Sequence, residues 1–340
     1  MIKKLLISLL LLITLSSCSK QEKYEAQVFD TFDTIITFTS YQNSKKDFEK
    51  YKDILEKEFK RYNDLYDNYN AYKGINNIFM ININAGKKEL EVDKDIIDLL
   101  EFSKDYYNKT NHSVNIAMGS VLSEWHDFRE EGIKHPKKAK LPEMKVLKEK
   151  NKYTDINDIE VNKEKSTVYI NNPNTKIDVG AVAKGFAVEK IKQKLIKEGL
   201  DNGIISAGGN VVTIGDNPKS EDGYWKIAVQ NPDFSSKEYA NVLKVKDCAI
   251  VTSGDYQRYY EVDGKRYNHI INPKTLMPAT DFTSVTVITD DSAKADAFST
   301  ALFVNNLEDG KEMIKNKNIE VLWIDKDYKQ TKTKNLDAQK

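Results

Sequence analysis

The sequence has few cysteines and histidines, and it has no excess of charge of either sign. Two cysteines and four histidines occur among 340 residues, and they do not have the spacing of a zinc ligand set. The 52 basic and 52 acidic side chains give a formal net charge of zero, so nothing in the composition favours a nucleic-acid partner. Hydrophobic residues make up 40% of the chain, which excludes a chain that is disordered throughout.

Long apolar runs are also scarce, and one lies at the start of the sequence. Residues 5–15 are apolar except for Ser8 and Thr14, and they follow a short basic segment. This run is too short to cross a bilayer as a helix, and it is typical of the hydrophobic region of a signal peptide. Small residues then lead to Cys18, an order that resembles the signal of bacterial lipoproteins.

The lipoprotein resemblance predicts an anchored protein. We expect residues 1–17 to be a lipoprotein signal peptide, Cys18 to carry lipid and residues 18–27 to form a polar, lipidated tether. The lipid would hold the domain at the extracytoplasmic face of the bacterial cell membrane. The alternative is an ordinary signal peptide that is cut nearby. If Cys18 carries lipid, no intrachain disulfide can form, and we expect Cys248 to be a small core residue on a strand.

Apolar periodicity predicts a domain that mixes helices and strands. Helical spacing predicts helices over residues 45–66, 96–107, 117–125, 182–198 and 293–304. Segments with strong β propensity predict strands over residues 28–39, 167–170, 203–206, 210–214, 225–229, 239–245, 249–252, 256–262, 267–271, 284–289 and 320–324. No repeat or Gly/Ser linker divides the chain, so we expect one α+β domain over residues 28–335, with mainly antiparallel sheets and packed helices.

Residues 176–185 are a candidate phosphate-binding segment. The pattern predicts a strand end, a tight turn and a helix start, and backbone N–H groups at a helix start favour phosphate. Gly180 would allow a close backbone approach. Asp178 would either bind a ligand or cap the helix. The glycine and lysine order of a P-loop is missing.

Residues 206–210 contain a glycine pair between two predicted strands. We expect a turn there, and a backbone contact to a flat ligand or phosphate is the alternative. The segment lacks the full GxGxxG pattern, so it does not favour a Rossmann domain.

Asp296 and Thr300 are a candidate metal-binding pair. They are four residues apart on a predicted helix and share one face, among small and apolar neighbours. A buried carboxylate needs a partner or a metal, and oxygen ligands of this kind suit Mg²⁺. The alternative is a hydrogen-bonded aspartate, with Thr300 bonded back to the preceding turn.

His269 is a further candidate, at a strand end before Pro273. Polar residues at loop edges often carry function. A hydrogen-bonded structural histidine is the alternative.

Five segments together resemble the ApbE family of FAD:protein FMN transferases. In chain order they are residues 177–187, 206–210, 252–259, 269–273 and 295–302. The resemblance runs from about residue 29 to residue 304 and implies a T-fold-like α+β domain. It also implies Mg²⁺-dependent transfer of FMN from FAD to a threonine or serine hydroxyl of a separate extracytoplasmic protein, with release of AMP. The acceptor would carry a short motif that contains aspartate and threonine.

The resemblance also implies roles for particular residues. FAD contacts are expected at Phe32, Tyr69, Ala117, Met118, Gly119, Asp178, Lys184 and Ile271. The Mg²⁺ ligands would be the Ala181 carbonyl, Asp296 and Thr300, and the catalytic residues would be His269 and Asp296. The sequence departs from the family pattern at Phe32, often a methionine, at Ser299, an aspartate in some members, and at Asn272, usually an aspartate.

The chemistry of such a transfer is positional and electrostatic. Mg²⁺ would neutralise the diphosphate of FAD, and a base near the acceptor, such as His269, would remove the proton of the attacking hydroxyl. Two alternatives share the same residues. One is an FAD pyrophosphatase that uses water as acceptor, and the other is a flavin-binding lipoprotein without catalysis.

Overall fold

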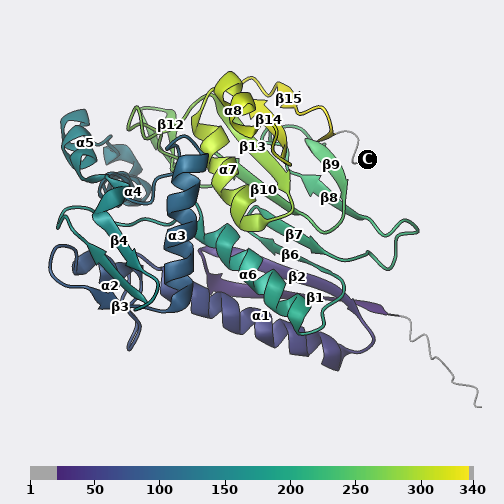
Figure 1. Cartoon of the computed structure of the whole chain (residues 1–340). Coiled ribbons are helices and arrows are strands. Elements are labelled where there is room, and N and C mark those ends of the chain that lie inside the picture. The colour runs from purple at the N-terminus through teal and green to yellow at the C-terminus, as the bar shows by residue number, and fades with distance from the viewer. Residues whose placement is uncertain (1–20, 337–340) are drawn as a thin grey trace, which may run out of the picture.

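The computed structural model describes residues 21–336, so the predictions for the signal peptide and Cys18 lie outside the described residues. An antiparallel sheet of eight strands forms the centre, in the order β1-β2-β6-β7-β10-β13-β14-β15 (Figure 1). Its strands are β1 (Glu22–Thr31), β2 (Thr34–Gln42), β6 (Gly203–Ala207), β7 (Asn210–Ile214), β10 (Ala249–Gly254), β13 (Phe282–Thr289), β14 (Glu320–Asp325) and β15 (Gln330–Lys332).

Helices cover one face of this sheet, and a hairpin covers the other. The covering helices are α1 (Lys45–Tyr66), α6 (Ala183–Lys197) and α7 (Ser292–Val304), and the hairpin is β8 (Trp225–Val229) with β9 (Asn241–Val245). Alternation along β2 produces the two faces. Phe38 stacks on Phe48 of α1 at 5.3 Å between ring centroids, whereas Tyr41 lies 6.0 Å from Trp225 of the hairpin.

A smaller helical part packs beside the sheet, at the ends of strands β1 and β6 (Figure 1). It contains α2 (Ile78–Ile83), α3 (Lys94–Lys109), α4 (Gly119–Lys134), α5 (Met144–Lys150) and a sheet of β3 (Leu90–Glu91), β5 (Thr167–Ile170) and β4 (Ile159–Asn162). Aromatic rings join it to the covering helices, because Phe102 lies 5.3 Å from Phe186 and Tyr106 lies 5.9 Å from Phe298. The remaining elements are β11 (Tyr259–Val262), β12 (Lys265–Asn268) and α8 (Leu307–Ile314).

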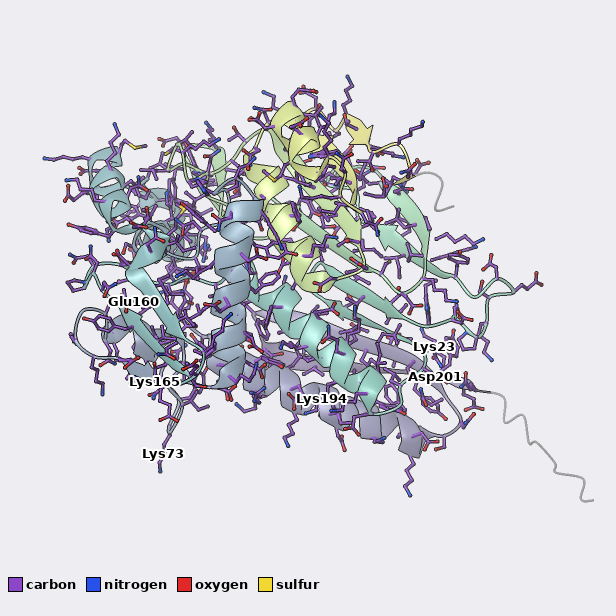
Figure 2. All side chains as sticks on the ribbon, in the orientation of Figure 1. Lys23, Lys73, Glu160, Lys165, Lys194 and Asp201 are labelled. Atoms are coloured by element: carbon purple, nitrogen blue, oxygen red, sulfur yellow. The ribbon has the colours of Figure 1, made fainter. Side chains whose placement is uncertain are left out.

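Charge is spread over the surface. Figure 2 shows the charged side chains around the whole outline, and the six labelled ones, Lys23, Lys73, Glu160, Lys165, Lys194 and Asp201, are all exposed. Within residues 21–336, no helix has both the length and the apolar character needed to span a bilayer.

The α+β prediction with mainly antiparallel sheets is confirmed, and several details differ. The strand expected over residues 28–39 is two strands, because Phe32 and Asp33 turn the chain with φ of 52° and 49°. Residues 22–27, expected as tether, belong to β1. Cys248 precedes β10 instead of lying on it, and burial raises the pKa of its thiol to about 11. Strand β15 follows the last strand that the sequence predicts.

Candidate active site

The predicted site segments meet at one end of the central sheet. The β1–β2 and β6–β7 turns lie side by side there, because Ile36 pairs with Ala207 and Thr34 touches Gly208. A methyl group at position 208 would collide with the Thr34 side chain, and both Gly208 and Gly209 have positive φ. The predicted glycine turn is therefore confirmed, and its glycines allow the close contact between the two hairpins.

Asp296 is fixed at the contact between α6 and α7. Its Oδ2 accepts a hydrogen bond from Gly185 N–H at 2.7 Å, and a side chain at position 185 would collide with Asp296 and with the Ser292 carbonyl. Burial raises the pKa of Asp296, and the charge of Lys184 opposes that rise. The helix pair thus holds one carboxylate in the interior without a salt bridge.

The Ala181 carbonyl is open, just before the start of α6. Gly185 is the third residue of this helix, so its N–H has no acceptor within the helix, and Asp296 supplies that acceptor. Within residues 21–336, no backbone N–H bonds to the Ala181 carbonyl. This oxygen is therefore available to a ligand at the same helix start that holds the carboxylate.

Thr300 lies one turn beyond Asp296 and keeps its hydroxyl open. The back-bond to the preceding turn is made by Ser299, whose Oγ donates to the Asp296 carbonyl at 3.0 Å and lies 2.8 Å from Ser253 Oγ. Within residues 21–336, Thr300 Oγ1 bonds to no side chain and to no main-chain carbonyl, whereas Ser299 bonds to the Asp296 carbonyl. The alternative reading of Thr300 is therefore wrong, and the Ser299 hydroxyl is occupied.

These oxygens fit Mg²⁺ as a donor set. Asp296, Thr300 and Ala181 offer a carboxylate, a hydroxyl and a carbonyl, all hard oxygen donors. In the described part of the chain, no three or more His, Cys, Asp or Glu side chains cluster as metal ligands. A cation at Asp296 would therefore depend on oxygens from a bound ligand to complete its shell.

Lys184 lies beside this carboxylate. Its Nζ donates to the Gly208 carbonyl at 2.7 Å, and burial lowers the pKa of its amine, with the charge of Arg258 acting in the same direction. The glycine turn therefore provides the backbone carbonyl that holds this lysine.

Asp178 does not cap the helix. Its Oδ1 accepts a hydrogen bond from Gly180 N–H at 2.9 Å, and its Oδ2 accepts one from Asn68 at 3.1 Å. Helix α6 starts after Val182, which makes no side-chain cap. Burial raises the pKa of Asp178. Of the two sequence interpretations, capping is wrong.

Tyr69 and residues 117–119 lie near Asp178. Asn68, which bonds Asp178, precedes Tyr69, and the half-exposed Tyr69 ring stacks on His126 at 4.5 Å. Gly119 N–H donates to the Lys176 carbonyl at 3.0 Å, so the start of α4 lies two residues from Asp178. Burial, with Asp178 as the second cause, raises the pKa of Tyr69 to about 12.

Ile271 packs against α4, and Asn272 contacts the end of α7. Ile271 is buried in one apolar cluster with Met118. Asn272 donates to the Val304 carbonyl at 2.7 Å and accepts a hydrogen bond from Lys274 N–H at 2.8 Å. Because both ends of its amide are used locally, Asn272 fastens the end of α7.

His269 is held by one main-chain carbonyl. Its Nδ1 and its backbone N–H both lie 3.1 Å from the Arg258 carbonyl. A neutral ring with Nδ1 as donor leaves Nε2 as a proton acceptor. Burial, together with the charges of Arg258, Arg129 and Lys184, lowers the pKa of His269 to about 4. The ring is therefore neutral near pH 7.

Phe32 lies at the tip of the β1–β2 turn. Its ring meets Phe59 edge-on at 6.3 Å, and its N–H donates to Asn63 at 2.9 Å. The Phe32 carbonyl faces Arg258 at 3.4 Å. The ring packs on α1, so a ligand would meet the backbone of this turn.

Four residues near the site were not singled out from the sequence: Asn68, His126, Arg129 and Arg258. Arg129 lies 2.9 Å from His126, which stacks on Tyr69. Arg258 belongs to a segment that carries the family resemblance, which was the one signal that pointed to it. The others depend on side-chain contacts between distant segments.

The predicted site segments thus meet around Asp296 and Lys184 at the start of α6. A family model, the ApbE family, matches residues 32–323. An FAD:protein FMN transferase of Treponema pallidum is 32% identical over 67% of this chain and 64% of its own length. One of Klebsiella pneumoniae is 27% identical over 74% of each chain. The crystal structure of the ApbE protein of Thermotoga maritima has a TM-score of 0.82 at 25% identity, covering 94% of this chain and 99% of the other. The chain belongs to the ApbE family.

Proposed function

We propose that this chain is an FAD:protein FMN transferase that requires Mg²⁺. The relatives above carry this activity in their names, which supports the proposal. The observation that carries the proposal is the α6–α7 junction. There, Asp296 binds the start of α6 through Gly185, close in the chain to Lys184 and to the open Ala181 carbonyl, and Thr300 lies one turn further along α7.

The residues of the chain divide the work of the reaction. Asp296, Thr300 and the Ala181 carbonyl would hold Mg²⁺, which supplies charge neutralisation at the diphosphate when it is bound. Lys184 and the turn N–H groups near Asp178 would orient the phosphates, and Tyr69 would contact the flavin ring. Asp296 itself is buried, which strengthens its attraction for a cation.

His269 is the proposed base. Its Nε2 accepts the proton of the acceptor hydroxyl, and the hydroxyl oxygen bonds to the phosphorus of the FMN half. The bond from that phosphorus to the bridging oxygen breaks, and AMP leaves with that oxygen. The product is a phosphoester between FMN and a threonine or serine of the acceptor. We further propose that the acceptor is an extracytoplasmic protein with an Asp- and Thr-containing motif, and that lipid on Cys18 anchors the enzyme on the same side of the membrane.

The decisive experiment incubates the protein with FAD, Mg²⁺ and an acceptor peptide or domain. Transfer predicts yellow in-gel fluorescence on the acceptor, a mass gain equal to FMN, and AMP in amounts equal to the modified acceptor. AMP release without modified acceptor would indicate the pyrophosphatase, and tight FAD binding without any AMP would indicate a flavin-binding protein. A Cys18→Ser variant tests the anchor, because it should appear in the soluble fraction.

A further inference from the structure

Two cations at the site are bonded to main-chain carbonyls of neighbouring turns. Lys184 donates to Gly208 in the β6–β7 turn, and Arg258 Nη2 donates to the carbonyls of Phe32 and Asp33 in the β1–β2 turn, at 3.4 Å each. The two turns touch through Thr34 and Gly208. The charge of Arg258 also contributes to the lowered pKa of Lys184, so the two cations are close in space.

The guanidinium of Arg258 has little countercharge. Among the described side chains it forms one ion pair, with Asp33 at 3.8 Å, and the two side chains are 46% and 92% exposed. Its two bonds to carbonyls are long for hydrogen bonds. Since a guanidinium binds phosphate oxygens through two parallel N–H groups, a phosphate would be a better partner than the carbonyls.

The backbone of Arg258 is fixed at the proposed base. Its carbonyl is the group that contacts both His269 Nδ1 and the His269 N–H. The guanidinium therefore extends from a point beside His269 toward the turn where FAD contacts are expected. A phosphate bound by Arg258 would lie between His269 and the β1–β2 turn.

We propose that Arg258 is a phosphate-binding residue of this site and that, together with Lys184, it binds the diphosphate of FAD. The inference rests on the proposed use of FAD and adds a residue to it. Arg258 recognises the charge and shape of the phosphates, so its contribution depends on how many phosphates the flavin carries. Riboflavin, which has none, should not depend on it.

The test compares the binding of FAD, FMN and riboflavin by flavin fluorescence, without turnover. We expect Arg258→Gln to weaken FAD and FMN binding by about 10- to 100-fold, the size expected for a lost charge-assisted contact, and riboflavin binding by less than about twofold. Arg258→Lys should retain part of the FAD affinity, because it keeps the charge and loses the fork. Arg266→Gln is the matched control, since Arg266 bonds Glu261 at 3.5 Å and stacks over Tyr259 in the β11–β12 hairpin.

Two outcomes would overturn the inference. Equal weakening of all three flavins by Arg258→Gln would show that Arg258 only shapes the site, and unchanged FAD binding would show that it contacts no phosphate. If Arg258→Gln does not fold, Arg258→Lys decides in the same way, together with a steeper salt dependence for FAD than for riboflavin. If Arg258→Gln weakens FAD binding as expected but the wild-type protein transfers no FMN, the proposed transferase activity is wrong and the inference about Arg258 still holds.

Discussion

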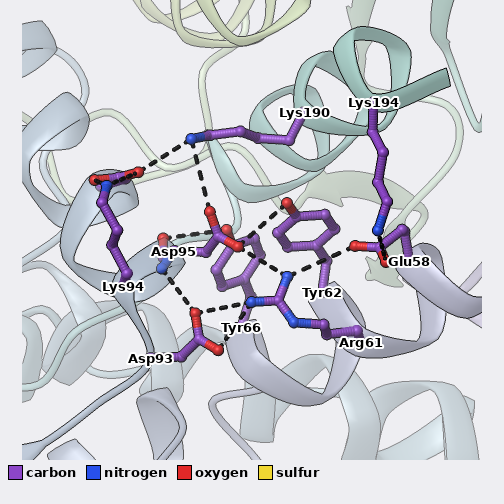
Figure 3. A network of polar contacts seen from close by, with 10 residues as sticks. Glu58, Arg61, Tyr62, Tyr66, Asp93, Lys94, Asp95, Lys190 and Lys194 are labelled. Atoms are coloured by element: carbon purple, nitrogen blue, oxygen red, sulfur yellow. Dashed lines mark hydrogen bonds and ion pairs between the residues drawn. The ribbon is translucent and has the colours of Figure 1, made fainter. Parts of the chain in front are cut away.

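Two groups of titratable side chains in the molecule have opposite electrostatics. The first, the Arg61 network, joins α1, α3 and α6 (Figure 3). Arg61 bonds Asp93 and Asp95 at 2.8 Å, and Lys190 bonds Asp98 at 3.1 Å. Burial favours the neutral forms of these side chains, but the attraction between opposite charges is stronger. The pKa of Arg61 is therefore raised and that of Asp98 is lowered.

The active-site group contains the same kinds of residue with other partners. Lys184, His269 and Asp296 each meet a backbone group at 2.7–3.1 Å instead of an opposite charge. Burial therefore dominates, and every shift favours the neutral form: the pKa values of Lys184 and His269 are lowered, and that of Asp296 is raised. The Arg61 network pairs its charges internally, whereas a cation at Asp296 and a diphosphate at Lys184 would each add an opposite charge to the active site.

The strongest test of this contrast is Asp296→Asn. Loss of the carboxylate should lower FMN transfer by about 1000-fold, because it removes the one negative charge expected to hold the cation. Stability should not fall. The folded-state pKa of Asp296 is raised, so its ionised form opposes folding near pH 7, and that cost disappears as pH falls through the folded pKa. Thermal unfolding near pH 7 should give an unchanged or higher Tm, and a lower Tm would contradict the contrast.

His269→Gln should have the next largest effect. We expect kcat to fall by about 100-fold, since a positioned base contributes at least that much, while FAD binding stays within about twofold of the wild type.

The pH profile of the wild type sharpens this prediction. The neutral ring is the active form, and the pKa of His269 is lowered from 6.5 to about 4. The acid limb of kcat/KM should therefore lie well below pH 6.5 and be absent in His269→Gln. An acid limb of kcat/KM near pH 6.5 would show that negative charges around His269 already offset the effect of burial before any ligand binds.

Part of the fold and of the site was accessible from the sequence, whereas the Arg61 network was not. Local patterns predicted α1, α7 and β7 closely, because apolar spacing and turn residues are encoded within each segment. They also identified Asp296 and Thr300, which share a helix face. They missed that Gly185 donates to Asp296 and so fixes the carboxylate at the start of α6, since this bond joins residues 111 positions apart. They also offered, as the alternative, a back-bond from Thr300, which the structure assigns to Ser299. Spacing along a helix does not distinguish two neighbouring hydroxyls, and only the contact with Ser253 identifies Ser299.

Breaking the Arg61 network should lower the stability of the fold and leave kcat nearly unchanged. Arg61→Leu would leave Asp93 and Asp95 without their shared partner, and we expect a loss of about 2 kcal/mol, less than for a fully buried pair because Arg61 is about a third exposed. Urea unfolding measures this loss. The kcat per folded molecule should stay within about twofold of the wild type. A fall in kcat comparable to that of His269→Gln would show that the two groups are coupled.

The smallest effects should separate two neighbouring hydroxyls on α7. Thr300→Val keeps the shape and removes the open hydroxyl, so transfer at limiting Mg²⁺ should fall by about tenfold and recover in part when Mg²⁺ is raised. Ser299→Ala removes a hydroxyl whose bonds go to Ser253 and the Asp296 carbonyl. It should cost about 1 kcal/mol of stability, with the Mg²⁺ dependence unchanged. The reverse result, with Ser299→Ala shifting the Mg²⁺ requirement and Thr300→Val only the Tm, would place the cation on the other side of the helix. In that case the open Ala181 carbonyl would no longer mark the position of the cation.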